Sequence, residues 1–382
     1  MAYRSSWMTD ELTLFRGELR KFLKSEQARS WADSGRLQKR VDREAWRALG
    51  QIGALCPEAS VEYGGRGGTF AHVAAVIEDL ENLLPEMTIG VTVHNAIVSQ
   101  YVLAYGSPEQ KQRWLPGLVT GQLIGAIAIT EPDAGSDVQS IKTHAQRRGN
   151  NYELNGQKIF ITNGQIADLI IVAAKTEPEQ GIRGISQFVV EAGETVGFRR
   201  GRSLDKIGQP ASDTAELIFD NAVVPSENLL GAEGRGFMQI MEQFSKERLA
   251  LAIQAVTGTE RAVEITVAYA KGRKVSGSPI IEFQNTAFKL AERRSEAFIG
   301  RVFIDWCIER LICGDLDQVT AAIAKWWTTA KQAETTDECL QLHGGYGYLR
   351  EYEIARRFVD ARVQKIYGGT NEIMKLIIAQ SL

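Results

Sequence analysis

The sequence predicts an α+β fold in which a compact β domain lies between two helical regions. Residues 8 to about 118, and those from Gly236 to the end, show helical periodicity, whereas residues 119 to 228 contain short strand-like runs separated by Gly, Pro and Asp. Helices and strands do not alternate along the chain, which argues against a Rossmann-type sheet. We expect an N-terminal helical domain, a middle β domain and a C-terminal helical domain, with bounds 1–118, 119–228 and 229–382.

Helical patterns dominate the first region. Apolar residues recur at helical spacing from His72 to Leu84, and residues 44–49 form a shorter helical pattern. Residues 88–105 are nearly all apolar or small, which indicates a buried helix. Ser107 followed by Pro108 is typical of a helix start, because Ser caps the first turn and Pro suits the first helical position.

Short apolar runs predict strands in the middle region. They cover residues 169–174, 186–190 and 215–219, and an earlier run, 127–129, ends in a loop at Thr130. Residues 151–160 predict a β-hairpin with Asn155-Gly156 as its turn, because Asn-Gly favours tight two-residue turns.

The composition is that of a globular enzyme with an ample core: 382 residues, 44% hydrophobic and 24% charged. A net charge of −3 gives no reason to expect nucleic-acid binding or a polybasic membrane surface. No secretory signal is visible and no apolar run is long enough to span a bilayer. We expect a cytoplasmic protein, although a mitochondrial matrix protein stripped of its transit peptide would look the same.

Metal, disulfide and nucleotide-loop chemistry is not expected. The four Cys are few and scattered, and the four His show no metal-binding spacing. Residues 63–68 lack the ending of a P-loop, and residues 345–347 lack the third glycine of a dinucleotide fingerprint. Both glycine-rich stretches are typical of tight turns.

Two segments, 131–137 (EPDAGSD) and 160–164 (FITNG), are the most informative. The first is a loop whose backbone N–H groups and hydroxyls suit an anionic or hydrogen-bonding ligand. The second delivers an aromatic side chain, a Thr and a Gly at the end of a strand-like run. Each alone is equally compatible with an ordinary surface loop; together they indicate a short β excursion that holds a large planar cofactor.

A carboxylate stands out on the helix that follows Gly236. Ile240, Phe244, Glu247 and Leu251 recur at spacings of four, three and four, so they share one helical face. A glutamate within an apolar stripe is costly unless it is paired or functional. Two interpretations are open: a core ion pair with a basic residue of a packing neighbour, or a reactive carboxylate.

Ordered motifs over essentially the whole chain resemble the acyl-CoA dehydrogenase family. Segments 131–137 and 160–164 resemble its flavin-binding signature, whereas residues 56–58 and 63–65 match only loosely. Closer matches are 208–217 (GQPASDTAEL), 223–225 (VVP), 228–231 (NLLG), 341–347 (QLHGGYG) and 366–373 (IYGGTNEI). The C-terminal motif is most similar to the long-chain acyl-CoA dehydrogenase subgroup.

The resemblance implies a β-barrel-like middle domain, a C-terminal four-helix bundle, and FAD between them. By resemblance, Thr130 and Thr162 would meet the flavin ring, Phe160 would cover its face, and Ile129, Gly135 and Ser136 would line the cradle. Positions that match the family's adenine-dinucleotide contacts, several of them across a subunit interface, are Arg273, Gln284, Gln341, Gly345, Thr370 and Glu372. Ser276 stands where the family's Arg-x-x-Phe-Gly has Phe, which puts the detail of those contacts in doubt.

The resemblance also implies an acyl thioester site. Dehydrogenation needs a carboxylate that removes an α-proton while a hydride leaves the β-carbon for flavin N5. Most members carry this glutamate in Tyr-Glu-Gly-Thr, but isovaleryl and long-chain types have Gly or Ala there and the base on the earlier helix. Here Gly368 stands at that position and Glu247 matches the relocated base. Substrate-binding residues would be Ser136, Phe244, Glu247, Arg248 and Gly368, with Arg248 supporting the base unless it forms a simple surface or interface ion pair.

We therefore expect an FAD-dependent acyl-CoA dehydrogenase of fatty acid metabolism that forms the trans-2-enoyl thioester. The resemblance implies a homotetramer and an electron-transferring flavoprotein as oxidant. One alternative is dehydrogenation of an acyl group on an acyl carrier protein, because both carriers present the same phosphopantetheine thioester. Another is a catalytically silent flavoprotein, against which the retained Glu247 argues. The acyl chain length depends on how residues 88–105 pack against the Glu247 helix.

Overall fold

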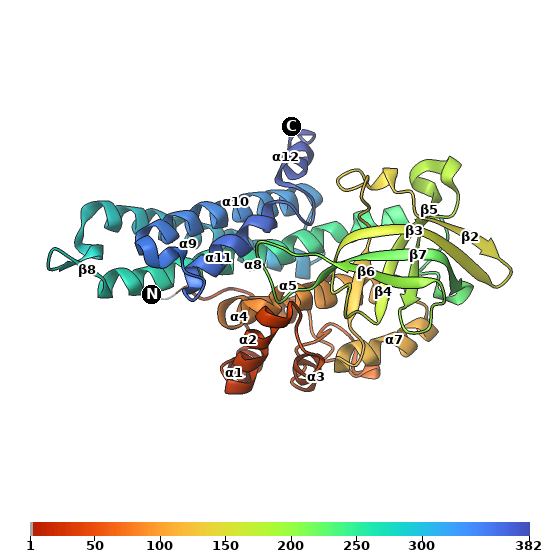
Figure 1. The fold of residues 1–382 in the computed structure, drawn as a ribbon, viewed down its shortest axis with the longest axis horizontal. Helices are drawn as coiled ribbons and strands as arrows, with labels where there is room; N and C mark the ends of the chain where they lie inside the picture. Colours follow the sequence, from red (N-terminus) through yellow and green to blue (C-terminus); the bar gives the residue numbers. More distant parts are fainter. Residues whose placement is uncertain (1–2) are drawn as a thin grey trace.

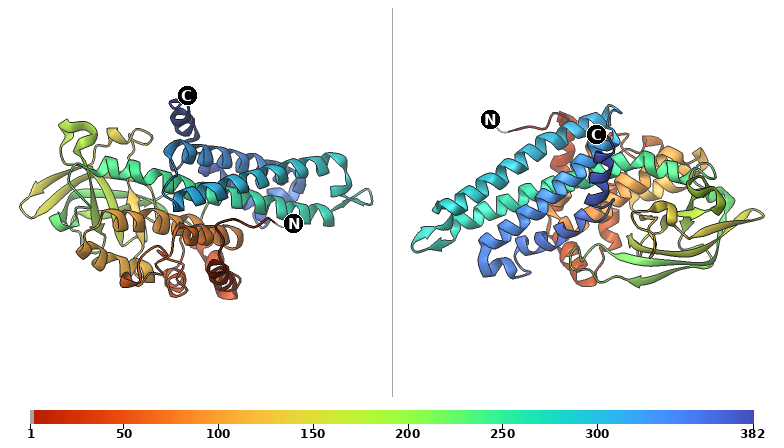
Figure 2. Two further views of the ribbon diagram at one scale, coloured as in Figure 1. Left: turned by 180° about the vertical axis from the view of Figure 1, so that it is seen from behind. Right: turned by 90° about the horizontal axis from the view of Figure 1, so that it is seen from above.

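Helices occupy both ends of the chain and a curled β-sheet occupies its middle in the computed structural model, which describes residues 3–382 (Figure 1). The sheet, yellow to green, forms one end of the elongated molecule, and the long C-terminal helices form the other. The first N-terminal helices lie along one side of the junction between them (Figures 1 and 2). This arrangement confirms the predicted α+β class with helical terminal domains.

The N-terminal helices begin at capped residues. Thr9, Ser25 and Asp42 each accept a backbone N–H bond at the start of a helix, which satisfies one of its free donors. Ser107 forms a capping box with Gln110 and Pro108 opens the helix, which confirms the predicted start. The helices are α1 (Asp10–Leu23), α2 (Glu26–Gln38), α3 (Arg43–Gln51), α4 (Phe70–Leu83), α5 (Pro85–Thr92), α6 (Ser99–Tyr105) and α7 (Pro108–Thr120).

Residues 88–105 are buried as predicted but do not form one regular α-helix. A π-helix, η2 (Val93–Val98), joins α5 to α6. Two side chains bond a backbone carbonyl of this π-helix. Ser99 Oγ and Gln100 Nε2 both donate to the carbonyl of Asn95, at 2.7 and 3.0 Å. The Asn95 side chain in turn bonds Ala54 O and Cys56 N. π-Turns often occur at functional sites, and this one faces α8 (Gly236–Gly272).

The middle domain is a seven-stranded sheet in the order β1-β4-β2-β3-β7-β6, with β5 paired to β4. Its longest pairing is antiparallel, between β3 and β7, from Asn151 opposite Pro225 to Thr162 opposite Thr214. The strands are β1 (Gly125–Ala128), β2 (His144–Arg148), β3 (Asn151–Thr162), β4 (Leu169–Lys175), β5 (Ile185–Glu191), β6 (Phe198–Ser203) and β7 (Thr214–Pro225). The three predicted strands are present as β4, β5 and part of β7.

The predicted hairpin with an Asn155-Gly156 turn is wrong. β3 continues through both residues, and the chain reverses instead at Gly149, which has a φ of +60°, between β2 and β3. Asn155 pairs with His144, and the register with β7 shifts between Leu154 and Gly156. A Cβ on Gly156 would lie 2.3 Å from Thr143 Oγ1. Gly156 therefore allows the chain at Thr143 to pack closely against β3 at a β-bulge, which is a common role of Gly within strands.

The C-terminal domain consists of long packed helices. α8 is 37 residues long and runs from the sheet to the far tip of the bundle, where a short β8–β9 hairpin turns the chain (Figures 1 and 2). Its most extensive packing is against α10 and α9. The other elements are β8 (Lys274–Val275), β9 (Ser278–Pro279), α9 (Gln284–Ile312), α10 (Gln318–His343), α11 (Glu353–Arg362) and α12 (Asn371–Ala379). Within residues 3–382 no helix is long and apolar enough to cross a membrane.

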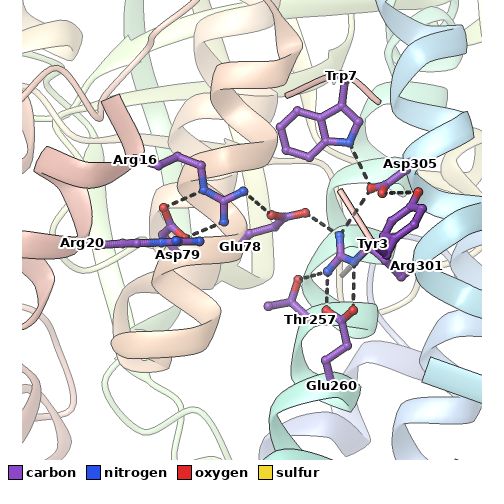
Figure 3. Close-up of polar contacts among 10 residues, drawn as sticks. All are labelled: Tyr3, Trp7, Arg16, Arg20, Glu78, Asp79, Thr257, Glu260, Arg301 and Asp305. Carbon is purple, nitrogen blue, oxygen red and sulfur yellow. Dashed lines mark hydrogen bonds and ion pairs between the residues drawn. The ribbon is translucent and has the colours of Figure 1, made fainter. Parts of the chain in front are cut away.

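Buried ion pairs join the N-terminal helices to the bundle (Figure 3). Glu78 on α4 lies between two guanidinium groups: Arg16 of α1, at 2.8 Å, and Arg301 of α9. Arg301 also binds Glu260 of α8 at 2.6 Å, so one side chain links three helices. Desolvation makes such groups expensive to leave unpaired.

We predict that Arg301→Met lowers the free energy of unfolding by about 3–5 kcal/mol, because Glu78 would remain buried without its second partner. Chemical denaturation of the holoenzyme, followed by circular dichroism, measures the change. Lys39→Met removes a pair with Asp205 in which both side chains are more than half exposed, so it should cost at most about 1 kcal/mol. Equal losses for the two variants would contradict the role given to the buried network.

Candidate active site

The two segments singled out in the sequence lie side by side. Ile159 N–H on β3 donates to the carbonyl of Thr130 at 3.0 Å, and the Lys158 ammonium donates to the carbonyl of Ile129 at 2.9 Å. The loop that follows β1 is therefore fixed directly beside the strand that carries Phe160 and Thr162. The separation of the two segments along the sequence does not predict this contact.

A buried ion pair supports the loop from below. Lys158 is fully buried and its Nζ lies 2.8 Å from Glu131 Oε1. The Glu131 carboxylate also accepts backbone N–H bonds from Lys142 and Thr143. Burial raises the pKa of Glu131, but the Lys158 charge and these hydrogen bonds outweigh it, so the pKa lies below its usual range; burial lowers the pKa of Lys158 to about 8.

Phe160 has an unusual backbone for a bulky residue, with a φ of +61°, and its side chain is 64% exposed. The register of β3 against β7 shifts between Lys158 and Ile161, which turns the ring out of the sheet. Buried Asn163 anchors the following turn, because its side chain donates to the carbonyls of Gly90 and Gly125 at 3.0 Å each. An exposed ring held in a strained conformation fits the cover of a planar group.

The remaining cradle residues lie on exposed backbone. Gly135 and Ser136 are exposed in the loop after Thr130, and a Cβ on Gly135 would meet nothing within 4 Å. Thr162 ends β3 in a half-buried position. The backbone of Gly135 and the hydroxyl of Ser136 are therefore accessible to a ligand.

Glu247 lies on the buried face of α8 and is 8% exposed. The hydroxyl of Tyr101, on α6, donates to Glu247 Oε1 at 3.0 Å. Burial raises the pKa of Glu247 to about 7, against the opposing effects of the Tyr101 hydrogen bond and the Arg248 charge. No cation lies within ion-pair distance of this carboxylate in residues 3–382, so the structure shows a tyrosine in place of a core ion pair.

Arg248 is buried beside Glu247, at 4% exposure, with its guanidinium 4.8 Å from the centre of the Phe244 ring. Its Nε and Nη1 atoms have no hydrogen-bond partner within the described part of the chain. Burial lowers the pKa of Arg248, opposed by the Glu247 charge. Buried donors without partners are costly, so this side chain has capacity for a polar ligand group.

The Gly368-Gly369 turn passes beside the same face of α8. Both glycines have positive φ, +62° and +85°, and a Cβ on Gly368 would lie 2.3 Å from Leu251 Cδ1. Lys325 of α10 ties the turn in place by donating to the carbonyl of Gly369 at 2.7 Å. Burial, followed by the Arg248 charge, lowers the pKa of Lys325 to about 7. A side chain at position 368 therefore requires Leu251 to move.

Three of the six residues matched to the adenine half of the cofactor lie at the tip of the bundle, away from the sheet that carries Phe160. Arg273, Gln341 and Gly345 line a cleft of about 490 Å³ that also includes Tyr269 and Tyr346. This cleft lies near the β8–β9 hairpin, at the end of the bundle away from the β domain (Figure 1). The remaining three residues lie at helix starts: Gln284 begins α9, Thr370 caps α12, and Glu372 lies in the first turn of α12.

Sequence reasoning missed three polar residues that shape the site: Tyr101, Lys158 and Lys325. For Lys158 a signal was available, because strand alternation places it on the inward face with Tyr152 and Leu154. Lys325 is buried on a helical face with Ala321 and Ala324, a pattern that also marks it as buried. Tyr101 carried only the weak signal of a phenol within an apolar stretch.

An exposed aromatic ring near an exposed loop, together with a buried carboxyl of raised pKa, is compatible with a flavin-type oxidoreductase site. Three profiles match the chain: "Acyl-CoA dehydrogenase, N-terminal domain" at residues 9–122, "middle domain" at 126–222 and "C-terminal domain" at 234–382. The long-chain specific acyl-CoA dehydrogenase of mouse mitochondria is 41% identical over 98% of this chain and 87% of its own length. The chain belongs to the acyl-CoA dehydrogenase family of flavin oxidoreductases, which confirms the resemblance.

Solved structures of related proteins have the same fold as this chain. An acyl-CoA dehydrogenase from Geobacillus kaustophilus is 46% identical, with a TM-score of 0.95 over 99% of each chain. A glutaryl-CoA dehydrogenase from Mycobacterium smegmatis, solved in complex with FADH2, is 27% identical with a TM-score of 0.89 over 98% of this chain and 95% of its own. The prolyl acyl carrier protein oxidase AnaB is 29% identical, with a TM-score of 0.90 over 98% of this chain and 99% of its own. FAD is the cofactor of this family, and residues 3–382 contain no group of His, Cys, Asp and Glu able to hold a metal ion.

We predict that Lys158→Met lowers the free energy of unfolding by about 3–5 kcal/mol and reduces FAD occupancy, because Glu131 would be left as an uncompensated buried charge under the loop. Thermal unfolding and the flavin-to-protein absorbance ratio measure the two effects. Adding Glu131→Gln to Lys158→Met removes that charge and should recover part of the stability. A single variant as stable as the parent would show that the pair does not support the loop.

Proposed function

We propose that the enzyme removes the α-proton of an acyl-CoA thioester with Glu247, in an FAD-dependent α,β-dehydrogenation. The supporting observation is the environment of Glu247: a buried carboxyl whose pKa burial raises to about 7. A general base with a pKa near the working pH combines a large ionised fraction with good basicity. Gly368, at the position where other members carry the base, has no side chain to compete for this role.

The other site residues bind and orient. Phe160, Thr130 and Thr162 would hold the flavin ring, and the exposed loop with Gly135 and Ser136 would hold the rest of the cradle and the pantetheine arm. Bound FAD supplies the hydride acceptor for the β-carbon. Arg248 offers unpartnered donors next to the base, which suits a polar group of the substrate or cofactor. The burial of Glu247 keeps water away from the carboxylate that takes the proton.

We infer that the cofactor site requires a second copy of the chain, because β3, which carries Phe160, belongs to the sheet, whereas the Arg273 cleft adjoins the β8–β9 hairpin at the far tip of the bundle (Figure 1). Exposed apolar side chains support self-association. They recur along α9, with Ile299, Val302 and Trp306 each more than 40% exposed, and Leu376 of α12 is 51% exposed. A homotetramer built as a dimer of dimers accommodates both features.

Coenzyme A is the proposed acyl carrier, and an acyl carrier protein is the alternative. The family favours coenzyme A, whereas the likeness to AnaB favours the carrier protein. Anaerobic bleaching of the flavin by acyl thioesters of graded length, presented on both carriers, separates the two and reports the chain length. An electron-transferring flavoprotein as oxidant and a cytoplasmic location are further proposals that rest on the resemblance and on the sequence.

We expect Glu247→Gln to retain FAD but to slow flavin reduction by about 10²–10⁴-fold, because the α-proton loses its acceptor. In the parent the reduction rate should rise with pH through about 7, as the carboxyl ionises, and this rise should be absent in the variant. Stopped-flow absorbance with a good thioester measures both. Glu264→Gln, an exposed position on the same helix, serves as control. Reduction by Glu247→Gln within a few-fold of the parent rate would assign the base elsewhere.

We expect FAD-loaded protein to sediment as an oligomer, because neither cofactor segment alone completes the site. A subunit-mixing experiment tests this more sharply. Phe160→Ala should weaken one half of the site and Arg273→Ala the other, so each variant alone should bind FAD poorly. Refolding the two together should restore FAD in those sites that combine two intact halves. A monomer with full FAD occupancy, or no recovery on mixing, would argue against a shared site.

A further inference from the structure

Several hydrogen bonds connect α6 to α8, and one of them ends on the proposed base. Gln100 accepts from the Lys246 ammonium at 2.7 Å, Tyr101 donates to Glu247, and Tyr105 donates to Glu242 at 2.8 Å. Tyr101 is fully buried between the two helices, whereas Tyr105 lies nearer the surface. A hydroxyl placed at such depth needs a partner, and the Glu247 carboxyl is the partner it has.

The π-helix η2 sets the direction in which Tyr101 points. One residue inserted into an α-helix rotates all later side chains by about 100° about the axis. Bonds from Ser99 and Gln100 to the Asn95 carbonyl hold this turn at its C-terminal end. The side chain of Asn95 ties the same turn to the loop at residues 54–56. The tyrosine therefore faces α8 because of a fixed irregularity of the backbone.

We propose that Tyr101 is a positioning residue for the α-proton base, holding the Glu247 carboxyl through Oε1 and favouring its ionised form. The proposal rests on the assignment of Glu247 as the base. Burial raises the pKa of the Tyr101 phenol well above its usual value, so the hydroxyl stays a donor throughout the working pH range. With Oε1 occupied, Oε2 is the oxygen free of hydrogen bonds from residues 3–382 and available to take the proton.

The charge balance around Glu247 involves few groups. Tyr101 and Tyr105 face it from α6, Arg248 lies next to it on α8, and Lys325 of α10 faces Arg248 in turn. Burial raises the pKa of Glu247, and the Tyr101 hydrogen bond is the first of the two effects that lower it. Removing the hydroxyl should therefore raise the pKa of the base and leave less of it ionised at neutral pH.

The test is the pH profile of flavin reduction in the FAD-loaded Tyr101→Phe variant. Loss of one hydrogen bond to a charged group should move the midpoint upward by about one to two pH units, so the rate at pH 7 falls about 5- to 50-fold and recovers at higher pH. Tyr105→Phe is the matched control, because it removes a hydroxyl bonded to Glu242 between the same two helices, and its midpoint should stay at the parent value. A purely structural role for Tyr101 would lower the rate equally at all pH values. An unshifted midpoint would overturn the proposal.

Two further variants keep the test decisive. If Tyr101→Phe does not take up FAD, Tyr101→Gln and Tyr101→Met replace it: they are similar in size, but only Gln donates, so only Gln should hold the midpoint near that of the parent. Adding Tyr101→Phe to the Glu247→Gln variant should not lower the rate of flavin reduction any further. A slow Glu247→Gln enzyme with an unshifted Tyr101→Phe profile refutes only the positioning role. A fast Glu247→Gln enzyme refutes the assignment of the base itself.

Discussion

Buried carboxylates on α4 fix the helix that carries the proposed base. Glu78 lies between Arg16 and Arg301, and one turn later Glu81 accepts from Arg357 of α11 and from Gln254 of α8. Burial raises the pKa of Glu81 to about 7 despite the opposing Arg357 charge. Because pairs of this kind are costly to break, the N-terminal helices, α8 and the outer helices cannot slide past one another without loss of stability. Glu247 is thereby held at a fixed depth below α6.

Two buried lysines hold the loops that border the site, and they do so in the same way. Lys158 donates to the carbonyl of Ile129 before the loop at residues 131–137, and Lys325 donates to the carbonyl of Gly369 in the turn beside α8. In both cases burial lowers the pKa of the ammonium group, to about 8 and about 7. A short loop can expose its donors to a ligand only if its backbone is held from the other side, and each lysine does this for its loop.

The parts of this structure that follow from periodicity were predictable, and those that depend on contacts distant in sequence were not. The shared face of Ile240, Phe244, Glu247 and Leu251 follows from 3.6-residue spacing in a long helix. The Asn155-Gly156 turn was wrong because the same pair suits a tight turn and a bulge, and only the neighbouring Thr143 distinguishes them. The Tyr101 contact spans 146 residues, which local pattern does not encode.

Placing a base on a helix instead of a turn changes what controls its pKa. The 368–369 turn has two residues of positive φ and is tied to Lys325, so a carboxylate there would lie near a buried cation and close to Leu251. On α8, Glu247 is instead buried, with a neutral phenol as its direct hydrogen-bond partner and the Arg248 charge next to it. Burial dominates in the second environment and is partly offset by one hydrogen bond and by the Arg248 charge. In the proposed mechanism the irregular helix opposite α8 therefore belongs to the acid–base machinery together with Glu247.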